Sequence, residues 1–283
     1  PPPPPPPLFT SRRRHTRLGR WSRGLGDVYK RQGVSYRLLE ASDRVGGRVK
    51  TDRVDGFQLD RGFQVLQTAY PVARRTLINY PLKLKRFPPG VVIHRDDRLY
   101  TLADPRRCPN YFWETMTAPV GQLTDRLRLL KMAYKVCSGS DESLFQRPES
   151  TAMAFLKASG FSENMIRSFF IPFFGGVCLD PLIRASSRVL QYVFRMFAEG
   201  DAALPENGME EIPRQISRTI PPERILTGVR VDRVAEGRVV LENGREWHAR
   251  AVVLATESPE VQRLLGRSDP IGSVSETCLY FST

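Results

Sequence analysis

The sequence predicts an α/β fold in which a sheet is interrupted by a mainly helical domain and then resumes. Short apolar runs and glycine-containing loops follow residue 33, and strand signals return after Gly208. Between these regions, residues 105–200 carry apolar side chains at helical spacing. The chain has 283 residues, of which 41% are apolar and 26% charged, so its composition is globular and it is long enough to bury a core.

The first 32 residues do not fit this fold. Seven prolines and a basic stretch follow neither a helical nor a strand period. Eight Lys or Arg residues against one Asp give a surplus of +7, which leaves +6 of the net charge of +13 for the remainder. Because DVYKRQ at Asp27–Gln32 resembles the translation of a sequencing-library adapter, we expect residues 1–32 to be a disordered, artefactual tail. The alternative is a natural basic tail that binds nucleic acid or anionic lipid.

Several protein classes receive no support from the sequence. No apolar run approaches the roughly 18–20 residues of a membrane-spanning helix, and the N-terminus lacks the layout of a secretion signal. The four cysteines are scattered without a CxxC pair, so neither a disulfide framework nor a zinc site is indicated. We therefore expect a cytoplasmic protein with reduced thiols and no metal.

The first folded region is predicted to begin with a buried strand and a loop. Tyr36–Glu40, YRLLE, is a short apolar run that ends in an acid, and the glycine-containing ASDRVGGR follows it. Gly56–Val65 alternates apolar and polar residues, as an extended segment beneath a ligand does. Val91–His94 and Arg98–Leu102 flank a polar stretch whose two aspartates favour a turn, which predicts a hairpin.

The middle region is predicted to be helical. An amphipathic helix of about four turns is expected from the spacing of its apolar face, which consists of Leu123, Leu127, Leu130, Ala133, Tyr134 and Cys137. Further helices are predicted over Thr151–Ala158, Glu163–Phe170 and Ser186–Ala198. Ser162 is the expected N-cap of the second of these.

The last region returns to strands after one short helix at Ile212–Thr219. Strands are predicted at Ile225–Thr227, Val229–Val234, Val239–Glu242 and Ala251–Ala255. Asn243-Gly244 predicts a hairpin turn with positive φ at both residues. The continuous apolar run AVVLA predicts that Ala251–Ala255 is a strand covered on both faces.

A carboxylate at the end of a strand, followed by a glycine loop, suits nucleotide binding. After the second strand of a nucleotide-binding sheet, such a carboxylate accepts hydrogen bonds from ribose hydroxyls, and Glu40 fits that position. Gly46 and Gly47 let backbone N–H groups approach a pyrophosphate, and Arg48 offers a charged fork to the same oxygens. On spacing alone, an ordinary glycine turn fits these residues equally well.

The segment LLEASDRVGGRV at Leu38–Val49 resembles the second-strand signature of the FAD-dependent amine oxidase superfamily, which includes the amine oxidases, protoporphyrinogen oxidase and the phytoene desaturases. GFQLDRGFQVLQTAYP, PFFGGVCLD, FRMFAEGDAALP and TCLYFS resemble a bacterial and plant branch of NAD(P)/FAD-dependent oxidoreductases. The resemblance covers residues 33–283. It implies a Rossmann-like FAD-binding domain, incomplete here, with an inserted and mainly helical substrate domain.

The resemblance also implies a set of cofactor-binding residues. They are Glu40, Ala41, Gly46, Gly47, Arg48, Gly62, Phe63, Gln64, Val65 and Val231. Glu40 would hold the adenosine ribose, the glycine pair and Arg48 would lie in the pyrophosphate region, and residues 62–65 would run beside the isoalloxazine. The backbone of Val231 would contact adenine, although a plain strand valine is equally consistent. Ala255 and Thr256 lie at the end of the last predicted strand. The resemblance favours a cofactor contact at these two residues no more than it favours the absence of one.

Two departures from the family pattern lead us to expect an internal fragment of a longer protein. The GxGxxG loop, which supplies the main pyrophosphate cradle, does not stand before Gly33. The chain also ends before the family's last FAD segment and the region of its flavin-facing lysine. We expect an FAD-binding domain at 33–75 and 204–268, a substrate domain at 76–203 and a truncated strand at 269–283. Such a fragment should bind FAD weakly or not at all.

Other candidate residues fit structural roles better than functional ones. Ser168–Leu179, SFFIPFFGGVCL, could line a lipophilic substrate channel or touch a membrane, but an apolar stretch in a helical domain is more often core. We expect structural or solvated roles for His15, His94, His248, Arg184, Arg188, Arg195 and Asp201. The sequence identifies no catalytic acid or base.

The predicted function is that of an FAD-dependent oxidoreductase, which transfers a hydride from an organic substrate to flavin N5. We expect a small lipophilic substrate and no nucleic acid, and peripheral membrane contact stays an open alternative. Two competing hypotheses are a basic protein that binds nucleic acid or an anionic surface, and a nicotinamide-dependent dehydrogenase. The first depends mostly on the charge of residues 1–32, and the second predicts a protein without the yellow colour of a flavin.

Overall fold

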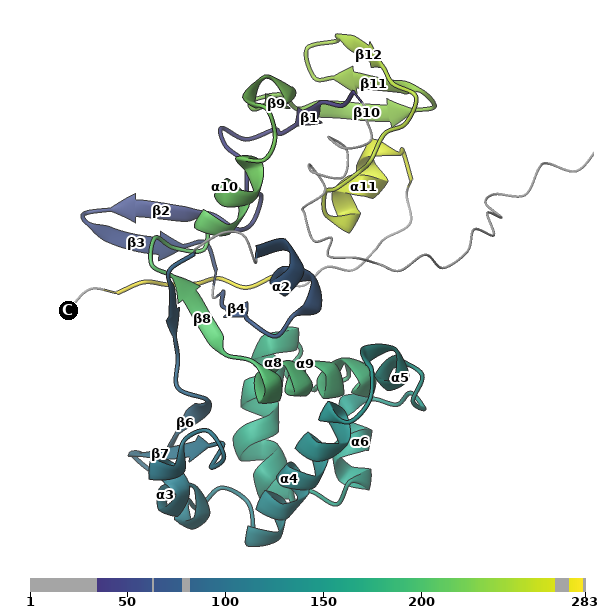
Figure 1. Cartoon of the computed structure of the whole chain (residues 1–283). Coiled ribbons are helices and arrows are strands. Elements are labelled where there is room, and N and C mark those ends of the chain that lie inside the picture. Colours follow the sequence, from purple (N-terminus) through teal and green to yellow (C-terminus); the bar gives the residue numbers. More distant parts are fainter. Residues whose placement is uncertain (1–34, 63, 78–81, 268–274, 282–283) are drawn as a thin grey trace, which may run out of the picture.

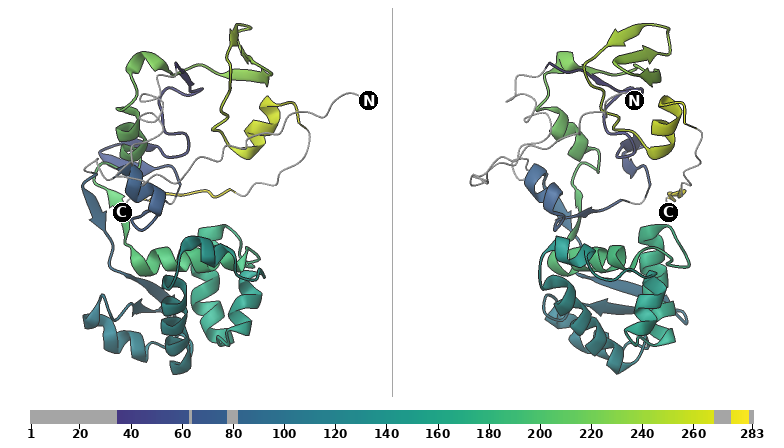
Figure 2. Two further views of the ribbon diagram at one scale, coloured as in Figure 1. Left: turned by 45° about the vertical axis from the view of Figure 1, so that its right-hand side comes forward. Right: turned by 90° about the vertical axis from the view of Figure 1, so that its right-hand side faces the viewer.

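The computed structural model describes residues 35–62, 64–77, 82–267 and 275–281. A body made mainly of helices, formed by residues 90–200, lies on one side of the molecule (Figure 1). Short strands and three short α-helices from both ends of the chain lie on the other side, and the two further views agree with this division (Figure 2). The tail at 1–32 and Phe63, one of the predicted site residues, lie outside the described residues.

The described strands form five small sheets. β1 (Leu38–Leu39) lies parallel to β9 (Ile225–Leu226), and the remaining pairs are antiparallel. The antiparallel sheets consist of β2 (Thr51–Val54) with β3 (Phe57–Asp60); β4 (Leu66–Gln67) with β8 (Ala202–Pro205) and β5 (Leu84–Arg86); β6 (Gly90–Arg95) with β7 (Arg98–Ala103); and β10 (Val231–Ala235) with β11 (Arg238–Leu241) and β12 (Glu246–His248).

Most of the described helices lie between residues 109 and 200. These are α3 (Phe112–Thr117), α4 (Leu123–Cys137), α5 (Asp141–Phe145), α6 (Ala152–Ala158), α7 (Glu163–Met165), α8 (Ile171–Cys178) and α9 (Ser187–Glu199). The helices outside this range are α2 (Pro71–Leu77), α10 (Glu211–Ser217) and α11 (Ser258–Leu264). Short 3₁₀ turns lie at Pro109–Tyr111 and Pro222–Arg224, and a π-helical turn at Ile166–Phe170 joins α7 to α8.

The main hydrophobic core lies inside the helical body. Leu144, Leu156 and Phe170 are fully buried there. The Phe170 ring packs edge-on against Phe161, with 4.8 Å between ring centroids. Within residues 168–179, Phe170 and Phe174 belong to this core, as the sequence predicted, and Phe169 and Phe173 are partly buried against it.

Local sequence signals predicted the N-cap Ser162 and one hairpin correctly, and two further helices that were not assigned caps begin in the same way. The side chains of Ser140, Thr151 and Ser162 accept hydrogen bonds from the third backbone N–H of α5, α6 and α7, as N-caps do. Asp96 and Asp97 form the turn between β6 and β7 with φ of 51° and 56°. Two successive left-handed residues match the right-handed twist of a two-residue hairpin.

The predicted apolar face of α4 is wrong, although its bounds are confirmed. Four of the six residues proposed for that face are exposed, namely Leu123, Leu127, Leu130 and Tyr134. The buried face contains Val136 together with the charged Asp125 and Arg126. Arg126 donates hydrogen bonds to several backbone carbonyls, including that of Ala118 at 2.8 Å. Because these polar groups are paired, they occupy core positions that apolar periodicity assigns to other residues.

The turn between β11 and β12 also differs from the prediction. Gly244 has a φ of 79°, whereas Asn243 does not have a positive φ. The Gly244 N–H donates to the Leu241 carbonyl, and the Leu241 N–H donates to that of Arg245, both at 2.9 Å. These bonds define a three-residue loop, in which one left-handed residue is sufficient.

Two predicted strands are absent from the described structure. Ala251–Ala255 forms no strand and Val253 is 75% exposed, so the expectation of a strand covered on both faces is wrong. Residues 275–281 form no strand either. Among the described residues, no neighbouring strand pairs with either segment, and an extended chain forms a sheet only when its backbone groups find such a partner.

Two further features are absent from the residues that the structure describes. No helix there is long and apolar enough to cross a membrane. No cluster of three or more His, Cys, Asp or Glu side chains in the same residues could hold a metal ion.

Candidate functional site

Glu40 lies at the carboxyl end of β1, as the sequence predicted. Its backbone N–H donates to the Leu226 carbonyl at 2.9 Å, and its carbonyl accepts from Val229 N–H at 3.0 Å. The strand end is therefore fixed against the segment that follows β9. The side-chain Oε1 accepts from the Ser42 N–H at 2.9 Å and from the Ser42 hydroxyl at 2.7 Å. Among the described residues, no hydrogen bond uses Oε2, which leaves one carboxylate oxygen able to accept from a ligand.

A buried lysine is connected to the Glu40 carboxylate through Ser42. Lys50 is 3% exposed, and its Nζ donates to the Ser42 hydroxyl oxygen at 2.7 Å. Its Nζ also lies 3.5 Å from the carboxylate oxygen Oδ1 of Asp43. Lys50, Ser42 and Glu40 thus form one connected polar network, which holds the start and the end of loop 40–50 together.

Gly46 and Gly47 occupy backbone conformations that favour glycine, with φ of 125° and 56°. A Cβ on Gly46 would lie 2.7 Å from the Val49 carbonyl oxygen, whereas a Cβ on Gly47 would meet nothing within 4 Å. Gly46 is therefore required by the loop itself. Gly47 borders open space, so its backbone can approach a ligand closely.

This contrast predicts different effects of the two alanine substitutions. We expect Gly46→Ala to destabilise the chain by roughly 2–3 kcal/mol, because a clash is added to the strain of positive φ. Gly47→Ala should cost only about 1 kcal/mol, which reflects φ alone. Urea unfolding of both variants measures the difference, and equal losses would contradict the assignment of Gly46 to the loop and Gly47 to the open side.

Arg48 pairs with Glu257, a residue that sequence reasoning missed. The guanidinium forms a two-pronged hydrogen bond with the Glu257 carboxylate at the N-terminal end of α11. This bond raises the pKa of Arg48 and lowers the pKa of Glu257. Both side chains are more than half exposed, so the pair is accessible to a competing anion.

The segment at residues 62–65 adjoins the same loop. Gln64 Nε2 donates to the Arg48 carbonyl at 3.0 Å and to the Arg61 carbonyl at 2.9 Å. The structure therefore brings together two parts of the predicted cofactor site, loop 40–50 and residues 62–65. Gly62 has a φ of 88°, which explains the glycine at the bend after β3.

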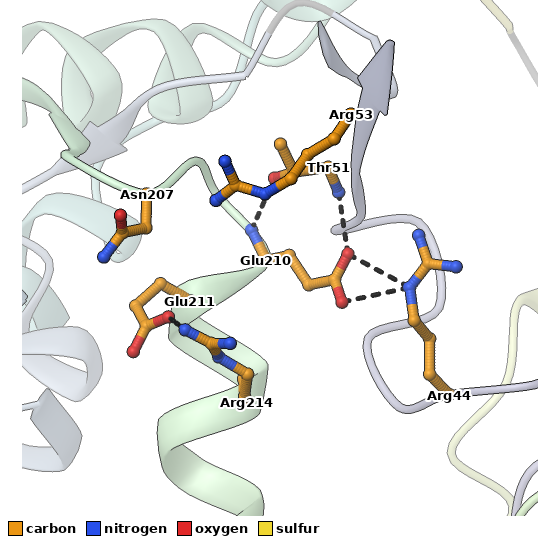
Figure 3. Close-up of a pocket in the computed structure, with 7 residues that line it drawn as sticks. All are labelled: Arg44, Thr51, Arg53, Asn207, Glu210, Glu211 and Arg214. Atoms are coloured by element: carbon orange, nitrogen blue, oxygen red, sulfur yellow. Dashed lines mark hydrogen bonds and ion pairs between the residues drawn. The ribbon is translucent and has the colours of Figure 1, made fainter. Parts of the chain in front are cut away.

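Glu210, next to α10, ties loop 40–50 to the second half of the chain. Its carboxylate accepts from the Thr51 N–H at 2.9 Å and from Arg44 Nε at 3.0 Å (Figure 3). The hydroxyl of Thr51 in turn accepts from the Glu210 N–H at 3.1 Å. Burial raises the pKa of Glu210, but these hydrogen bonds outweigh it, so the net shift is downward.

A cavity of about 110 Å³ lies beside this junction, lined by Arg44, Thr51, Arg53, Asn207, Glu210, Glu211 and Arg214. Figure 3 shows that its acidic and basic side chains are largely paired with one another, including Glu211 with Arg214. The cavity is too small for a nucleotide. It belongs to the structural junction and not to the predicted cofactor site.

Val231 begins β10, soon after the segment that bonds to Glu40. Its carbonyl accepts a hydrogen bond from Arg263 Nη2 at 2.9 Å, and Arg263 belongs to α11. β1, β9 and β10 lie next to one another in Figure 1. The structure therefore places the predicted ribose and adenine contacts in the same region.

The lower-ranked candidates have structural partners. Arg184 pairs with Asp180, Arg188 with Glu149, and Arg195 with Asp141 and Glu199. Asp201 pairs with Arg107 and Arg86 in the loop before β8. A separate open groove of about 810 Å³ runs between β6 and α8, and its lining includes His94, Phe169 and Phe173.

A family comparison decides the classification. The family model described as flavin containing amine oxidoreductase matches residues 25–275. The chain belongs to this family. A shorter match links this chain to the L-amino-acid oxidase of Bungarus fasciatus, with 38% identity over 74 residues, which are 25% of this chain and 14% of that protein.

Solved structures agree with the fold of the family. An oxidoreductase from Methanosarcina mazei aligns with a TM-score of 0.63 and 16% identity over 85% of this chain and 58% of its own length. Cyclohexylamine oxidase from Brevibacterium oxydans aligns with a TM-score of 0.56 and 20% identity over 85% of this chain and 56% of its own. The chain therefore has a mixed α/β fold of the flavin amine oxidase type and spans less than three fifths of these relatives' lengths.

Proposed function

We propose that this chain forms part of an FAD-dependent oxidoreductase and holds the nucleotide half of the flavin at loop 40–50. The observation that carries the proposal is the position of Glu40. Glu40 directly follows a strand that pairs in parallel with β9. One oxygen of its carboxylate accepts two hydrogen bonds from Ser42, and the other accepts none from the described residues. An oriented carboxylate of this kind accepts hydrogen bonds from a pair of ribose hydroxyls.

The neighbouring residues suit the rest of the nucleotide. The open side of Gly47 allows backbone N–H groups to approach a pyrophosphate, and Arg48 can exchange its exposed partner Glu257 for phosphate oxygens. β10, which begins at Val231, lies beside β1 and β9 in Figure 1, which is compatible with a contact between the Val231 backbone and adenine. Gln64 connects loop 40–50 to the segment expected beside the flavin ring. When bound, FAD would supply the hydride acceptor, flavin N5.

The chain's own contribution to the reaction is binding and orientation. Lys50 and Ser42 fix the Glu40 carboxylate before a ligand arrives, so little freedom is lost on binding. The substrate that we propose is a small lipophilic molecule. The described arginines with close carboxylate partners that the proposal leaves in place, such as Arg44 and Arg61, favour a paired surface over one that binds nucleic acid.

Adding FAD to the purified protein tests the proposal. We expect a protein of the length of its solved relatives to bind FAD and to absorb blue light as a flavoprotein. The present chain alone should bind FAD more weakly, because a GxGxxG loop is not part of its sequence. Binding of NAD without FAD, or a colourless protein of family length after addition of FAD, would contradict the proposal.

A further inference from the structure

Gln67 on β4 is a buried side chain whose amide has no partner. The residue is 4% exposed, and neither Oε1 nor Nε2 forms a hydrogen bond with any residue that the structure describes. An amide buried in this way destabilises the fold unless a partner is supplied. Gln67 lies just beyond residues 62–65, the segment expected beside the flavin ring.

The backbone around Gln67 is held too firmly for a shift of the strand to supply that partner. Gln67 lies opposite Ala202 in the pairing of β4 with β8. The next residue, Thr68, donates its N–H to the Asp201 carbonyl at 3.0 Å and accepts from the Asp201 N–H at 2.8 Å through its hydroxyl. Asp201 is itself fixed by Arg107 and Arg86.

Another buried glutamine of this chain is treated differently. Gln191 in α9 is 2% exposed, its Nε2 donates to the Ser187 carbonyl at 3.1 Å, and its Oε1 accepts from Arg147 at 2.8 Å. The two residues share type and burial but differ in hydrogen bonding. The side-chain amide of Gln191 therefore stabilises the fold through hydrogen bonds, whereas the side-chain amide of Gln67 makes no such contribution.

We propose that Gln67 is a contact of the flavin ring and that it pairs its amide with the donor–acceptor edge of the ring's pyrimidine half. The inference rests on the proposed function. A glutamine amide presents an NH₂ donor beside a C=O acceptor, so its full complement is a group with an N–H beside a C=O. The pyrimidine half of a flavin carries this edge. A water molecule satisfies the same amide less specifically, and the experiment below separates the two.

Methionine substitutions at the two glutamines test this role, because methionine has a similar length and no polar group. Without cofactor, Gln67→Met should raise the midpoint of thermal unfolding, since an unpaired amide is removed. Gln191→Met should lower it, since two hydrogen bonds are lost. With cofactor, Gln67→Met should weaken binding of both FAD and riboflavin at least tenfold, whereas Gln191→Met should leave both affinities unchanged.

Riboflavin distinguishes the ring from the nucleotide. Glu40→Ala should weaken FAD binding but not riboflavin binding, which lacks the adenosine, whereas Gln67→Met should weaken both. A lower unfolding midpoint for Gln67→Met would overturn the proposal, because Gln67 would then be paired within the scaffold, to water or protein. An unchanged affinity for FAD and riboflavin would overturn it as well. Failure of the unsubstituted protein of family length to bind FAD would instead overturn the proposed function, and the inference with it.

Discussion

Replacing Asp125 by alanine is expected to destabilise the chain by about 3–5 kcal/mol, because it removes a buried carboxylate that accepts four hydrogen bonds. Asp125 is fully buried at the start of α4. Its carboxylate accepts from the Gln122 N–H at 2.7 Å, the Ser162 N–H at 3.0 Å, the Ser162 hydroxyl at 2.5 Å and Arg128 at 3.0 Å. It therefore caps its own helix and connects it to the start of α7.

Urea unfolding of Asp125→Ala measures this loss. The matched control is Glu163→Ala, which removes an exposed carboxylate that pairs with Arg167 within one helical stretch. That control should change the free energy of unfolding by less than about 1 kcal/mol. A similar small change for Asp125→Ala would mean that the buried network contributes little to the fold.

The same carboxylate makes stability depend on pH. Burial raises the pKa of Asp125, but hydrogen bonds from Gln122, Ser162 and Arg128 outweigh it, so the net pKa lies below the ordinary value of 3.8. A group with a lowered folded-state pKa stabilises the fold above its ordinary pKa and loses that contribution as the pH falls through the lowered value. The stability of the unsubstituted chain should therefore fall below pH 3.8 more steeply than that of Asp125→Asn.

The largest functional effect is expected from truncating Glu40 and Arg48 together. Loss of the charge-assisted bond from Glu40 costs about 1.5–3 kcal/mol, which corresponds to roughly a tenfold to hundredfold weaker binding of FAD. Arg48→Ala should add a smaller loss, because Arg48 must first leave Glu257. Titration of the protein of family length with FAD, followed by flavin absorbance, measures both effects.

Glu257→Gln is the matched control, because the expected effect has the opposite sign. The substitution weakens the hold on Arg48 and leaves it free for phosphate oxygens, so FAD should bind more tightly. If the Glu40→Ala, Arg48→Ala double variant binds FAD as tightly as the unsubstituted protein, loop 40–50 is not part of the FAD-binding site. Weaker binding by Glu257→Gln would indicate that Glu257, and not the ligand, is the functional partner of Arg48.

Features set by neighbours in sequence were predictable, whereas features set by distant parts of the chain were not. Ser162 and the Asp96-Asp97 turn act through local hydrogen bonds or local φ, so residue type alone indicated them. The exposure of Leu127 was not predictable, because it depends on the pairing of Asp125 and Arg126 with distant groups. The absence of a strand at Ala251–Ala255 likewise depends on which strands lie beside it.

The residues of the candidate site also fall into those that local sequence predicts and those that it does not. Glu40 and the glycine pair follow from a strand, an acid and a loop that are adjacent in sequence. Lys50 and Glu257 carried no such signal, because a lysine in a basic chain and a glutamate at a helix start are common residues. Their contacts with Ser42 and Arg48 depend on the folded loop and, for Glu257, on a segment far along the chain.

Because β1 pairs with β9, the strand that contains Leu38 can form its sheet only after Ile225 has emerged from the ribosome. The intervening helices pack against one another, with α9 against α4, α5 and α6, and they precede Ile225 in the chain, so they can assemble while synthesis continues. We therefore expect protease protection during translation to arise first over residues 109–200 and only later over residues 38–50. A ribosome stalled before Ile225 would carry a folded helical body with loop 40–50 still unformed.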